Sequence, residues 1–268
     1  MQDSTDVQAL RQRLEFLEQR DSAHHYPAPE QISYIADLGT ARAFFLTEDH
    51  YSHDWFYPRY RNGRLHEPAL TRLMFDSLTP DSVMVDVGAH LGYFSVVTAL
   101  RAKAVFAIEP QEFLIGRIHR NVSANHLRNV TIIHAAAGSE TGFVNIPKVG
   151  TPSTRIGLSE NLVHMIRLDD YFSGPLQPTH MKIDTEGFEY HVLSGASALL
   201  AARPVLFIEY HRTMGHFGPS GEDMWTMLND FGYRIEVGNH RHGRKGFVEV
   251  TRETLHRHAG GMLVCRPR

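Results

Sequence analysis

The chain has 268 residues, of which 42% are hydrophobic and 21% charged, so it can bury a large core and is neither disordered nor fibrous. Its 27 Lys and Arg residues and 30 Asp and Glu residues leave a formal net charge of -3, which argues against a nucleic-acid or anionic-lipid partner. The single cysteine, Cys265, excludes an internal disulfide, and the polar first residues do not resemble a signal peptide, so we expect a cytoplasmic protein. The apolar runs fall far short of the roughly 20 residues of a membrane-spanning helix, so we expect no membrane partner.

The first 66 residues are expected to form an extension that is separate from the main domain. Within residues 7–20, apolar side chains recur every three or four positions, which predicts an amphipathic helix. Residues 44–60 are rich in aromatic side chains and His but have no helical period, so they predict short strands or a lid. We therefore expect an extension over 1–66, serving as a lid or as a homodimer contact, and a main domain over 67–268.

Beyond the extension, helical patterns alternate with short β-branched runs, which is typical of a mostly parallel sheet with helices on both faces. Strands are predicted over residues 83–87, 104–108, 130–134, 180–184 and 204–210. Helices are predicted over residues 68–78, 93–101, 111–126, 188–201 and 221–231. The last two apolar runs, 233–237 and 261–266, are joined by a basic connection with no helical period, and they predict an antiparallel hairpin at one sheet edge.

The strongest local signal is the sequence VDVGAHLGYFS, in which Gly88 and Gly92 flank a turn from strand to helix. Glycine tolerates a positive φ and lets a ligand approach the backbone, so we expect a ligand over this turn. The turn lacks the middle glycine of the dinucleotide pattern GxGxxG, which argues against an NAD-dependent oxidoreductase, and it lacks the GK[ST] of a P-loop. Asp86, at the end of the first strand, would repel a phosphate but can accept a hydrogen bond or face an ammonium group.

The second predicted strand ends in the sequence AIEP, which places Glu109 where open α/β folds bind the hydroxyl groups of a ribose. A ribose site beside Asp86 fits S-adenosylmethionine, which carries a ribose and an amino-acid end but no phosphate. His90 and Tyr93 lie within the glycine turn, where they either contact this ligand or only fill the turn.

Further segments extend this pattern along the chain: NVTIIHAAAG, IRLDDYF, MKIDTEGFEYHVLSGA and RPVLFIEYH. Together with the glycine turn and AIEP, they resemble the FkbM family of S-adenosylmethionine-dependent methyltransferases, from about Glu67 to about His211. The resemblance implies a class I methyltransferase fold, with a seven-stranded sheet whose last strand is antiparallel. Residues 1–60 and 139–165 match no pattern of the family, so we expect substrate choice to reside there.

The resemblance also implies how the cofactor lies. Asp86 and Gly88 would line its methionine part, Glu109 would bind the ribose, and Ala136 would lie beside the adenine, while Glu67 would approach from above. The cofactor-binding residues expected in this way are Glu67, Asp86, Gly88, Ala89, His90, Gly92, Tyr93, Glu109, Pro110 and Ala136.

The candidate catalytic residues follow the fourth and fifth strands, whose carboxyl ends meet at the ligand crevice of such a sheet. An alcohol acceptor must lose its proton as the new bond forms, so we expect Asp184 or His211 to be the base and Glu186 to orient the acceptor. In one alternative, Lys182, Asp184 and Glu189 form only a buried salt-bridge network. In another, Asp184, Glu186 and His211 hold Mg²⁺ or Mn²⁺, which would acidify a hydroxyl group.

These residues favour an O-methyltransferase that acts on a hydroxyl of a small molecule, such as a sugar or a specialised metabolite of the polyketide kind. An N-methyltransferase acting on a small amine is the nearest alternative, and a non-catalytic adenosine-binding scaffold is the third. Residues 148–160, rich in Gly, Ser and Thr, predict a mobile loop over the site, from which Arg155 can meet an anionic acceptor.

Overall fold

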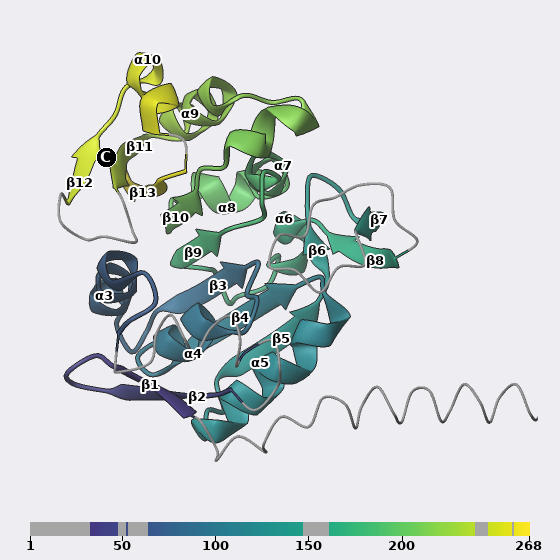
Figure 1. Cartoon of the computed structure of the whole chain (residues 1–268). Coiled ribbons are helices and arrows are strands. Elements are labelled where there is room, and N and C mark those ends of the chain that lie inside the picture. The colour runs from purple at the N-terminus through teal and green to yellow at the C-terminus, as the bar shows by residue number, and fades with distance from the viewer. Residues whose placement is uncertain (1–32, 48–51, 53–63, 147–160, 239–245, 259) are drawn as a thin grey trace, which may run out of the picture.

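The computed structural model describes residues 33–47, 52, 64–146, 161–238, 246–258 and 260–268. Its main feature is a large β-sheet (Figure 1). The strands of this sheet are β3 (Val83–Val87), β4 (Ala104–Glu109), β5 (Val130–His134), β9 (His180–Ile183), β10 (Val205–Glu209), β11 (Tyr233–Gly238), β12 (Phe247–Glu249) and β13 (Met262–Pro267). They lie in the order β12-β11-β13-β10-β9-β3-β4-β5.

The five strands from β10 to β5 run parallel, whereas β13 runs antiparallel to both of its neighbours, β10 and β11. A mostly parallel sheet with one reversed strand inserted near its edge is the class I methyltransferase arrangement that we expected. Within the described residues the sheet has eight strands rather than the expected seven, because the short strand β12 pairs with the outer edge of β11. Part of the connection before β13 is therefore ordered, although the sequence shows no period there.

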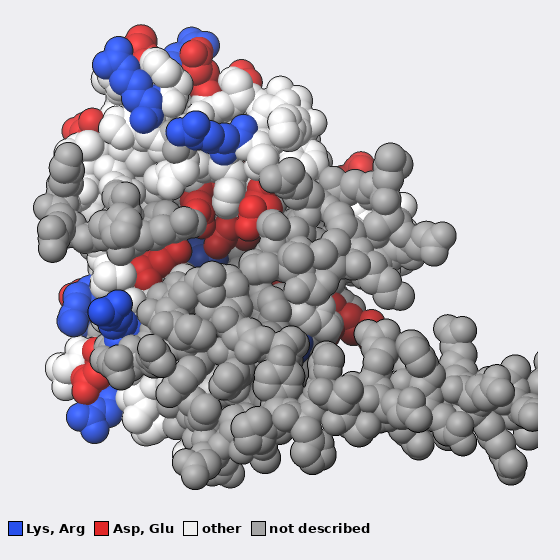
Figure 2. All heavy atoms as spheres, viewed as in Figure 1, with Lys and Arg blue, Asp and Glu red and all other residues white. Residues whose placement is uncertain are grey.

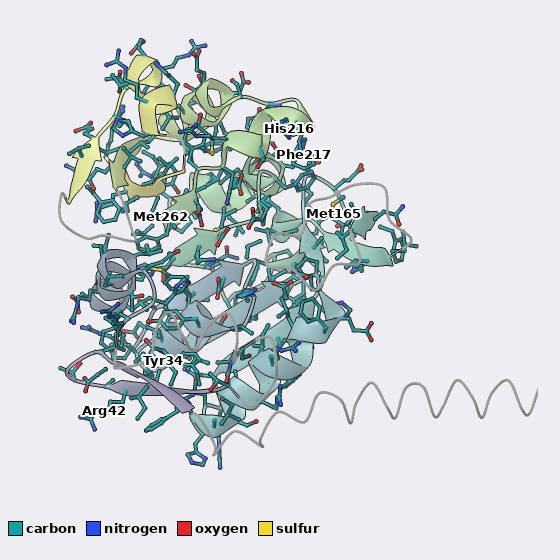
Figure 3. All side chains as sticks on the ribbon, viewed as in Figure 1. Tyr34, Arg42, Met165, His216, Phe217 and Met262 are labelled. Atoms are coloured by element: carbon teal, nitrogen blue, oxygen red, sulfur yellow. The ribbon has the colours of Figure 1, made fainter. Side chains whose placement is uncertain are left out.

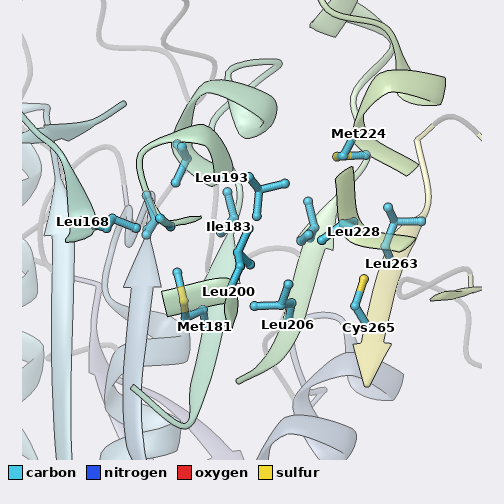
Figure 4. Close-up of a cluster of buried hydrophobic side chains, with 14 of the residues drawn as sticks. Leu168, Met181, Ile183, Leu193, Leu200, Leu206, Met224, Leu228, Leu263 and Cys265 are labelled. Atoms are coloured by element: carbon cyan, nitrogen blue, oxygen red, sulfur yellow. The ribbon is translucent and has the colours of Figure 1, made fainter. Parts of the chain in front are cut away.

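Helices cover both faces of the sheet, as the alternating pattern predicts. They are α3 (Pro68–Ser77), α4 (Tyr93–Ala99), α5 (Glu112–Ala124), α6 (Leu168–Tyr171), α7 (Glu189–Ser194), α8 (Ser197–Ala201), α9 (Gly221–Asp230) and α10 (Arg252–Leu255), with 3-10 turns η2 (Arg212–Phe217) and η3 (His256–His258). One hydrophobic cluster joins α3, α4 and α5 to the sheet, and a second cluster joins α7, α8 and α9 to its other face. Figure 4 shows part of the second cluster, in which Ile183 and Leu206 of the sheet lie among Leu193, Leu200 and Leu228 of the helices.

The helix expected over residues 188–201 is divided into α7 and α8. Between them, a Cβ atom on Gly195 would lie 2.0 Å from the backbone oxygen of Gly138, so the chain must pass close to another segment at this point. The backbone N–H of Gly195 still donates to the carbonyl groups of His191 and Val192, which ends α7. This close approach is a tertiary contact, and the local sequence pattern does not contain it.

The described part of the N-terminal extension is a hairpin of β1 (Ser33–Asp37) and β2 (Arg42–Leu46), which agrees with the short strands expected near residue 44. Tyr34 points into the core, whereas Arg42 points outward (Figure 3). Phe45 is also buried and stacks on Tyr93 with 5.1 Å between the ring centres. The hairpin therefore packs against the main domain. The helix expected over 7–20 and most of the aromatic segment lie outside the described residues, and the boundary after residue 66 stays a prediction.

A second, small sheet has no counterpart among the predicted elements. Its strands are β6 (Ala136–Ala137), β7 (Gly142–Ile146) and β8 (Asn161–Ile166), in the order β6-β8-β7. Strand β7 and most of β8 lie in the segment 139–165, which matches no pattern of the family. The loop expected over 148–160, with Arg155, lies outside the described residues. Among the helices that the structure does describe, none is long and apolar enough to span a bilayer.

Candidate active site

The carboxyl ends of β3, β4, β9 and β10 open into a cleft with a volume of about 1140 Å³. Acidic side chains gather in this hollow at the middle of the molecule (Figure 2). The carboxylates among the residues that line it are Glu67, Glu109, Asp184, Glu186 and Glu209. The cleft lies at the strand ends where open α/β sheets bind their ligands, and we expected the candidate catalytic residues there.

Gly88 begins the turn from β3 to α4 with a φ of +76°. Its N–H and that of Ala89 both donate to the carbonyl oxygen of Ile108, at 2.9 and 3.1 Å, which binds the turn to the end of β4. A Cβ atom on Gly88 would lie 1.9 Å from the backbone oxygen of Asp184. Glycine is therefore required here both for its positive φ and because the chain that follows β9 approaches so closely.

Asp86 lies beneath the cleft and is not among the residues that line it. Its Oδ2 accepts a 2.6 Å hydrogen bond from Ser95, and its Oδ1 lies 3.4 Å from the ammonium nitrogen of Lys182. The ammonium partner of Asp86 is therefore a side chain of this protein. We expected Asp86 to line the methionine part of a ligand, but in this structure it supports the floor of the cleft, and Gly92 likewise belongs to the turn and not to the lining.

Lys182 holds the tips of β3 and β9 together. Its ammonium nitrogen lies 3.4 Å from Asp184 Oδ2 and 3.4 Å from the carbonyl oxygen of Gly88, and 5.3 Å from the centre of the Phe94 ring. Burial by itself would lower the pKa of Lys182, but the carboxylates of Asp184 and Asp86 outweigh it, so the pKa is raised and the side chain stays charged.

Glu109 can accept hydrogen bonds from a polar ligand in the cleft. It is buried at the end of β4, where its Oε2 accepts the N–H of His90 at 2.8 Å and its Oε1 accepts the N–H of Gln111 at 2.9 Å. A carboxylate has about four acceptor positions, so both oxygens can still accept a hydroxyl group from the cleft. Burial raises the pKa of Glu109 to about 7, against the opposing effect of these two N–H groups.

Most of the other residues expected at the cofactor line the cleft. They are Glu67, Ala89, His90, Tyr93, Pro110 and Ala136. Glu67 precedes α3 with a φ of 45°, and His90 follows Ala89 with a φ of 55°. Burial lowers the pKa of His90 to about 3, so its ring is neutral at physiological pH and does not repel a cationic ligand. Phe188 and Ile146 also line the cleft but were not among the expected residues.

On the other side of the cleft, carboxylates surround the imidazole of His211. Its Nε2 lies 3.9 Å from Asp184, 3.7 Å from Glu186 and 3.8 Å from Glu209, while its Nδ1 lies 2.9 Å from Glu189 Oε1. Burial lowers the pKa of His211, but the hydrogen bond to Glu189 and the nearby negative charges raise it to about 9. The imidazole is therefore protonated at neutral pH and is poorly suited to act as the base that we expected.

Glu189 binds the turn after β9 and the ring of His211, contacts that the sequence does not predict. We considered it a partner of Lys182, but it is fully buried at the start of α7 and accepts hydrogen bonds from elsewhere. Its Oε1 accepts the N–H groups of Thr185 and Gly187, each at 3.0 Å, besides its contact with His211. Only the Lys182 and Asp184 part of the salt-bridge alternative is therefore formed.

Glu186 lies in a turn that the surrounding residues fix. Its φ is 56° and that of Gly187 is 112°. The hydroxyl of Thr213 donates to the carbonyl oxygen of Glu186 at 2.9 Å, and a Cβ atom on Gly187 would lie 2.7 Å from that hydroxyl. Positive φ at a residue other than glycine costs about 1–3 kcal/mol and tends to occur at functional sites. The turn directs Glu186 towards the same imidazole as Asp184.

This topology, the glycine turn after the first parallel strand and the buried acid that ends the second define a class I S-adenosylmethionine-dependent methyltransferase. The sequence matches the family model described as the methyltransferase FkbM domain over residues 86–235. The chain therefore belongs to the FkbM methyltransferase family.

One relative by sequence and two solved structures are also similar to this chain. A hexuronic acid methyltransferase, AglP, of Haloferax volcanii is 24% identical over 177 residues, which make up 64% of this chain and 71% of the relative. The crystal structure of an FkbM methyltransferase from Methylobacillus flagellatus is 22% identical with a TM-score of 0.48, and the match covers 82% of this chain but only 48% of that one. The structure of TYW2 from M. jannaschii in complex with AdoMet is 16% identical with a TM-score of 0.48, covering 88% and 86% of the two chains.

Proposed function

We propose that this methyltransferase transfers the methyl group of S-adenosylmethionine to a hydroxyl group of a small molecule, in the first place a sugar. One observation carries the proposal: a buried carboxylate suited to a ribose, at the end of β4, opens into the same cleft as a group of carboxylates at the ends of β9 and β10. Strand β3 and its glycine turn lie between the two. A nucleoside bound to Glu109 can therefore extend across Gly88 towards Asp184.

In this proposal the cofactor supplies an electrophilic methyl group on a sulfonium ion. The oxygen of the acceptor forms a bond to the methyl carbon as the carbon–sulfur bond breaks, and S-adenosylhomocysteine leaves. The hydroxyl proton goes to a carboxylate, for which we assign Asp184, because Lys182 and His211 keep it ionised by lowering its pKa against the effect of burial. Glu186 orients the acceptor, and His211 Nε2 lies between the two carboxylates, 3.9 Å from Asp184 and 3.7 Å from Glu186.

A sugar acceptor is supported by the polar lining of the cleft, because carboxylates accept hydrogen bonds from the hydroxyl groups of a sugar. The relative that acts on a hexuronic acid makes uronic acids the first sugars to test. Arg64 and Arg212 also line the cleft and can bind the carboxylate of such an acceptor. The same group of acids would repel nucleic-acid phosphates, which supports a small molecule over RNA.

An amine acceptor is the second candidate, because acidic side chains attract an ammonium group. They also stabilise the protonated amine, which has no free electron pair to attack the methyl group, and this favours a hydroxyl acceptor.

The test is a screen of purified protein with S-adenosylmethionine and panels of sugars, uronic acids and amines. We expect S-adenosylhomocysteine to form together with a product heavier by one methyl group, and we expect the product to come from a hydroxylated compound. Methylated amines alone would overturn the hydroxyl assignment. Binding of S-adenosylmethionine without turnover on any panel would favour the non-catalytic scaffold.

A further inference from the structure

The side chains around His211 have the spacing of ligands around an ion. Asp184, Glu186 and His211 each present one ligand atom to a common space, and these atoms lie within 4.8 Å of one another. The separations of 3.9 and 3.7 Å between the imidazole Nε2 and the two carboxylates are too long for hydrogen bonds. Ligands bound to one ion at about 2.1 Å stand about 3–4 Å apart, so a small inward shift would complete a coordination site.

Each of the three ligands is held from behind by another group of the protein. Lys182 holds Oδ2 of Asp184, which directs Oδ1 towards the common space. Glu189 binds Nδ1 of His211, which directs Nε2 towards the same space. An ion bound there would take the place of the proton on Nε2, because only a neutral imidazole nitrogen binds a metal. A carboxylate behind a histidine is the usual arrangement of metal-bound imidazoles, because it fixes both the tautomer and the orientation of the ring.

A second observation is a buried carboxylate oxygen next to this cluster. The Oε2 atom of Glu189 is buried and has no hydrogen-bond partner among the residues that the structure describes. Four carboxylates, those of Asp184, Glu186, Glu189 and Glu209, lie within 4.0 Å of the one imidazole. Glu189 and Glu209 are buried, whereas Asp184 and Glu186 are partly exposed, and a cation among the four carboxylates would reduce the repulsion between them.

We propose that Asp184, Glu186 and His211 bind one divalent cation of the Mg²⁺ or Mn²⁺ type, and that Glu189 is a positioning residue for this site. Two carboxylate oxygens and one imidazole nitrogen suit these ions, and Mn²⁺ above all, because oxygen ligands predominate. Three protein ligands leave coordination positions open towards the cleft. The role of the ion rests on the proposed function: it would bind the oxygen of the acceptor, lower the pKa of its hydroxyl and reduce the repulsion between a uronic acid and the acidic cleft.

The test begins with binding alone, without cofactor or acceptor. The full chain is freed of metal by dialysis against a chelator and titrated with Mn²⁺, and free Mn²⁺ is followed by electron paramagnetic resonance. We expect one Mn²⁺ per chain, with a pulsed-resonance coupling to an imidazole nitrogen that His211→Ala removes. Asp184→Asn and Glu186→Gln should each weaken binding by about 10–100-fold or more, whereas Asp76→Asn, on the exposed side of α3, should leave it unchanged.

Glu189→Gln tests whether Glu189 positions the imidazole of His211, because this substitution leaves the three ligands themselves unchanged. It should weaken Mn²⁺ binding by about 10–100-fold and alter the nitrogen coupling, although residue 189 does not touch the ion. Thermal melts monitored by circular dichroism identify any variant that does not fold. Absence of Mn²⁺ binding at millimolar concentration, or equal affinity in Asp184→Asn and the unchanged protein, would overturn the proposal.

Two further measurements separate this proposal from the proposed function. S-adenosylmethionine is titrated into the metal-free protein by calorimetry, and methyl transfer is measured with and without chelator. Full methyl transfer in chelator would contradict the metal site and leave the proposed function intact. Specific Mn²⁺ binding to a protein that binds no S-adenosylmethionine would contradict the proposed function and leave the metal site intact.

Discussion

The carboxylates on the two sides of the cleft differ in their hydrogen-bond and ion-pair partners. On the side of β3 and β4, Asp86 is bound by Ser95 and Lys182, and Glu109 accepts two backbone N–H groups at 2.8 and 2.9 Å. On the side of β9 and β10, three carboxylates stand 3.7–3.9 Å from one imidazole nitrogen, beyond hydrogen-bonding distance. The first side is therefore organised by the chain itself for a polar ligand, whereas the second concentrates negative charge around a space that a hydroxyl group or a cation can occupy.

In our proposal, catalysis takes place on the side of β9 and β10, and the cofactor binds on the side of β3 and β4. The largest expected effect tests the catalytic side. Asp184→Asn should lower the rate of methyl transfer by about 10²–10⁴-fold, because the variant cannot accept the proton of the acceptor. The affinity for S-adenosylmethionine, measured by calorimetry, should change much less. Asp76→Asn on α3 is the matched control and should keep the full rate. A rate within about threefold of normal in Asp184→Asn would remove the catalytic assignment.

The next effect tests the cofactor side. Gly88→Ala should abolish measurable binding of S-adenosylmethionine and lower the free energy of unfolding by roughly 3 kcal/mol or more, because the new Cβ meets the oxygen of Asp184. The same substitution at Gly116 is the control, since this residue lies in α5 and, apart from the adjacent turns of its own helix, no atom lies within 4 Å of a new Cβ. Gly116→Ala should raise helix stability by roughly 0.5–1 kcal/mol and leave binding intact. Normal binding by Gly88→Ala would show that the ligand lies elsewhere.

A smaller effect is expected at the ribose carboxylate. Glu109→Gln should weaken S-adenosylmethionine binding by about 10–100-fold, because the amide loses charge-assisted hydrogen bonds. In the unchanged protein, affinity should fall by up to about tenfold per pH unit below pH 7, because the pKa of Glu109 is about 7 and binding requires its ionised form. Calorimetry between pH 5 and pH 8 measures both effects, with exposed Glu112→Gln as the control. An affinity that does not change over this range would contradict the ribose assignment.

The smallest expected effect is the pH dependence of the rate between pH 7 and pH 9. The pKa of His211 is about 9, so a His211 base would make the rate rise by about tenfold per pH unit until the imidazole loses its proton. Proton transfer to Asp184, whose pKa is lowered, predicts no such rise. Initial rates at saturating cofactor and acceptor distinguish the two, and a steep rise towards pH 9 would restore His211 as the base.

Several strands and the place of Glu109 at a strand end could be predicted from the sequence. The strands predicted over 83–87 and 130–134 have the bounds expected, and Glu109 lies at the end of β4 beside the glycine turn. These features depend on short segments: alternation of strand and helix, a glycine that needs positive φ, and an acid at a strand end. The contact between Asp86 and Lys182 was not predicted, because it depends on the pairing of β3 with β9, which brings the two residues side by side.

For the acidic side of the cleft, the sequence predicted which residues take part but not which partners they contact. Asp184, Glu186 and His211 were each expected near the acceptor, but the choice of partner by Glu189 depends on how α7 begins above the turn that follows β9. The small sheet β6-β8-β7 and the break at Gly195 also depend on contacts between distant segments. No local periodicity reports such contacts, so the sequence pattern could not reveal them.

The most direct test is a crystal structure of the full chain with S-adenosylhomocysteine. We predict that the ribose hydroxyl groups bind Glu109 and that the sulfur atom lies past Gly88, facing Asp184 and His211. A nucleoside in the cleft whose sulfur points away from these side chains, or a ligand bound outside the cleft, would contradict the division of the site into a cofactor side and a catalytic side.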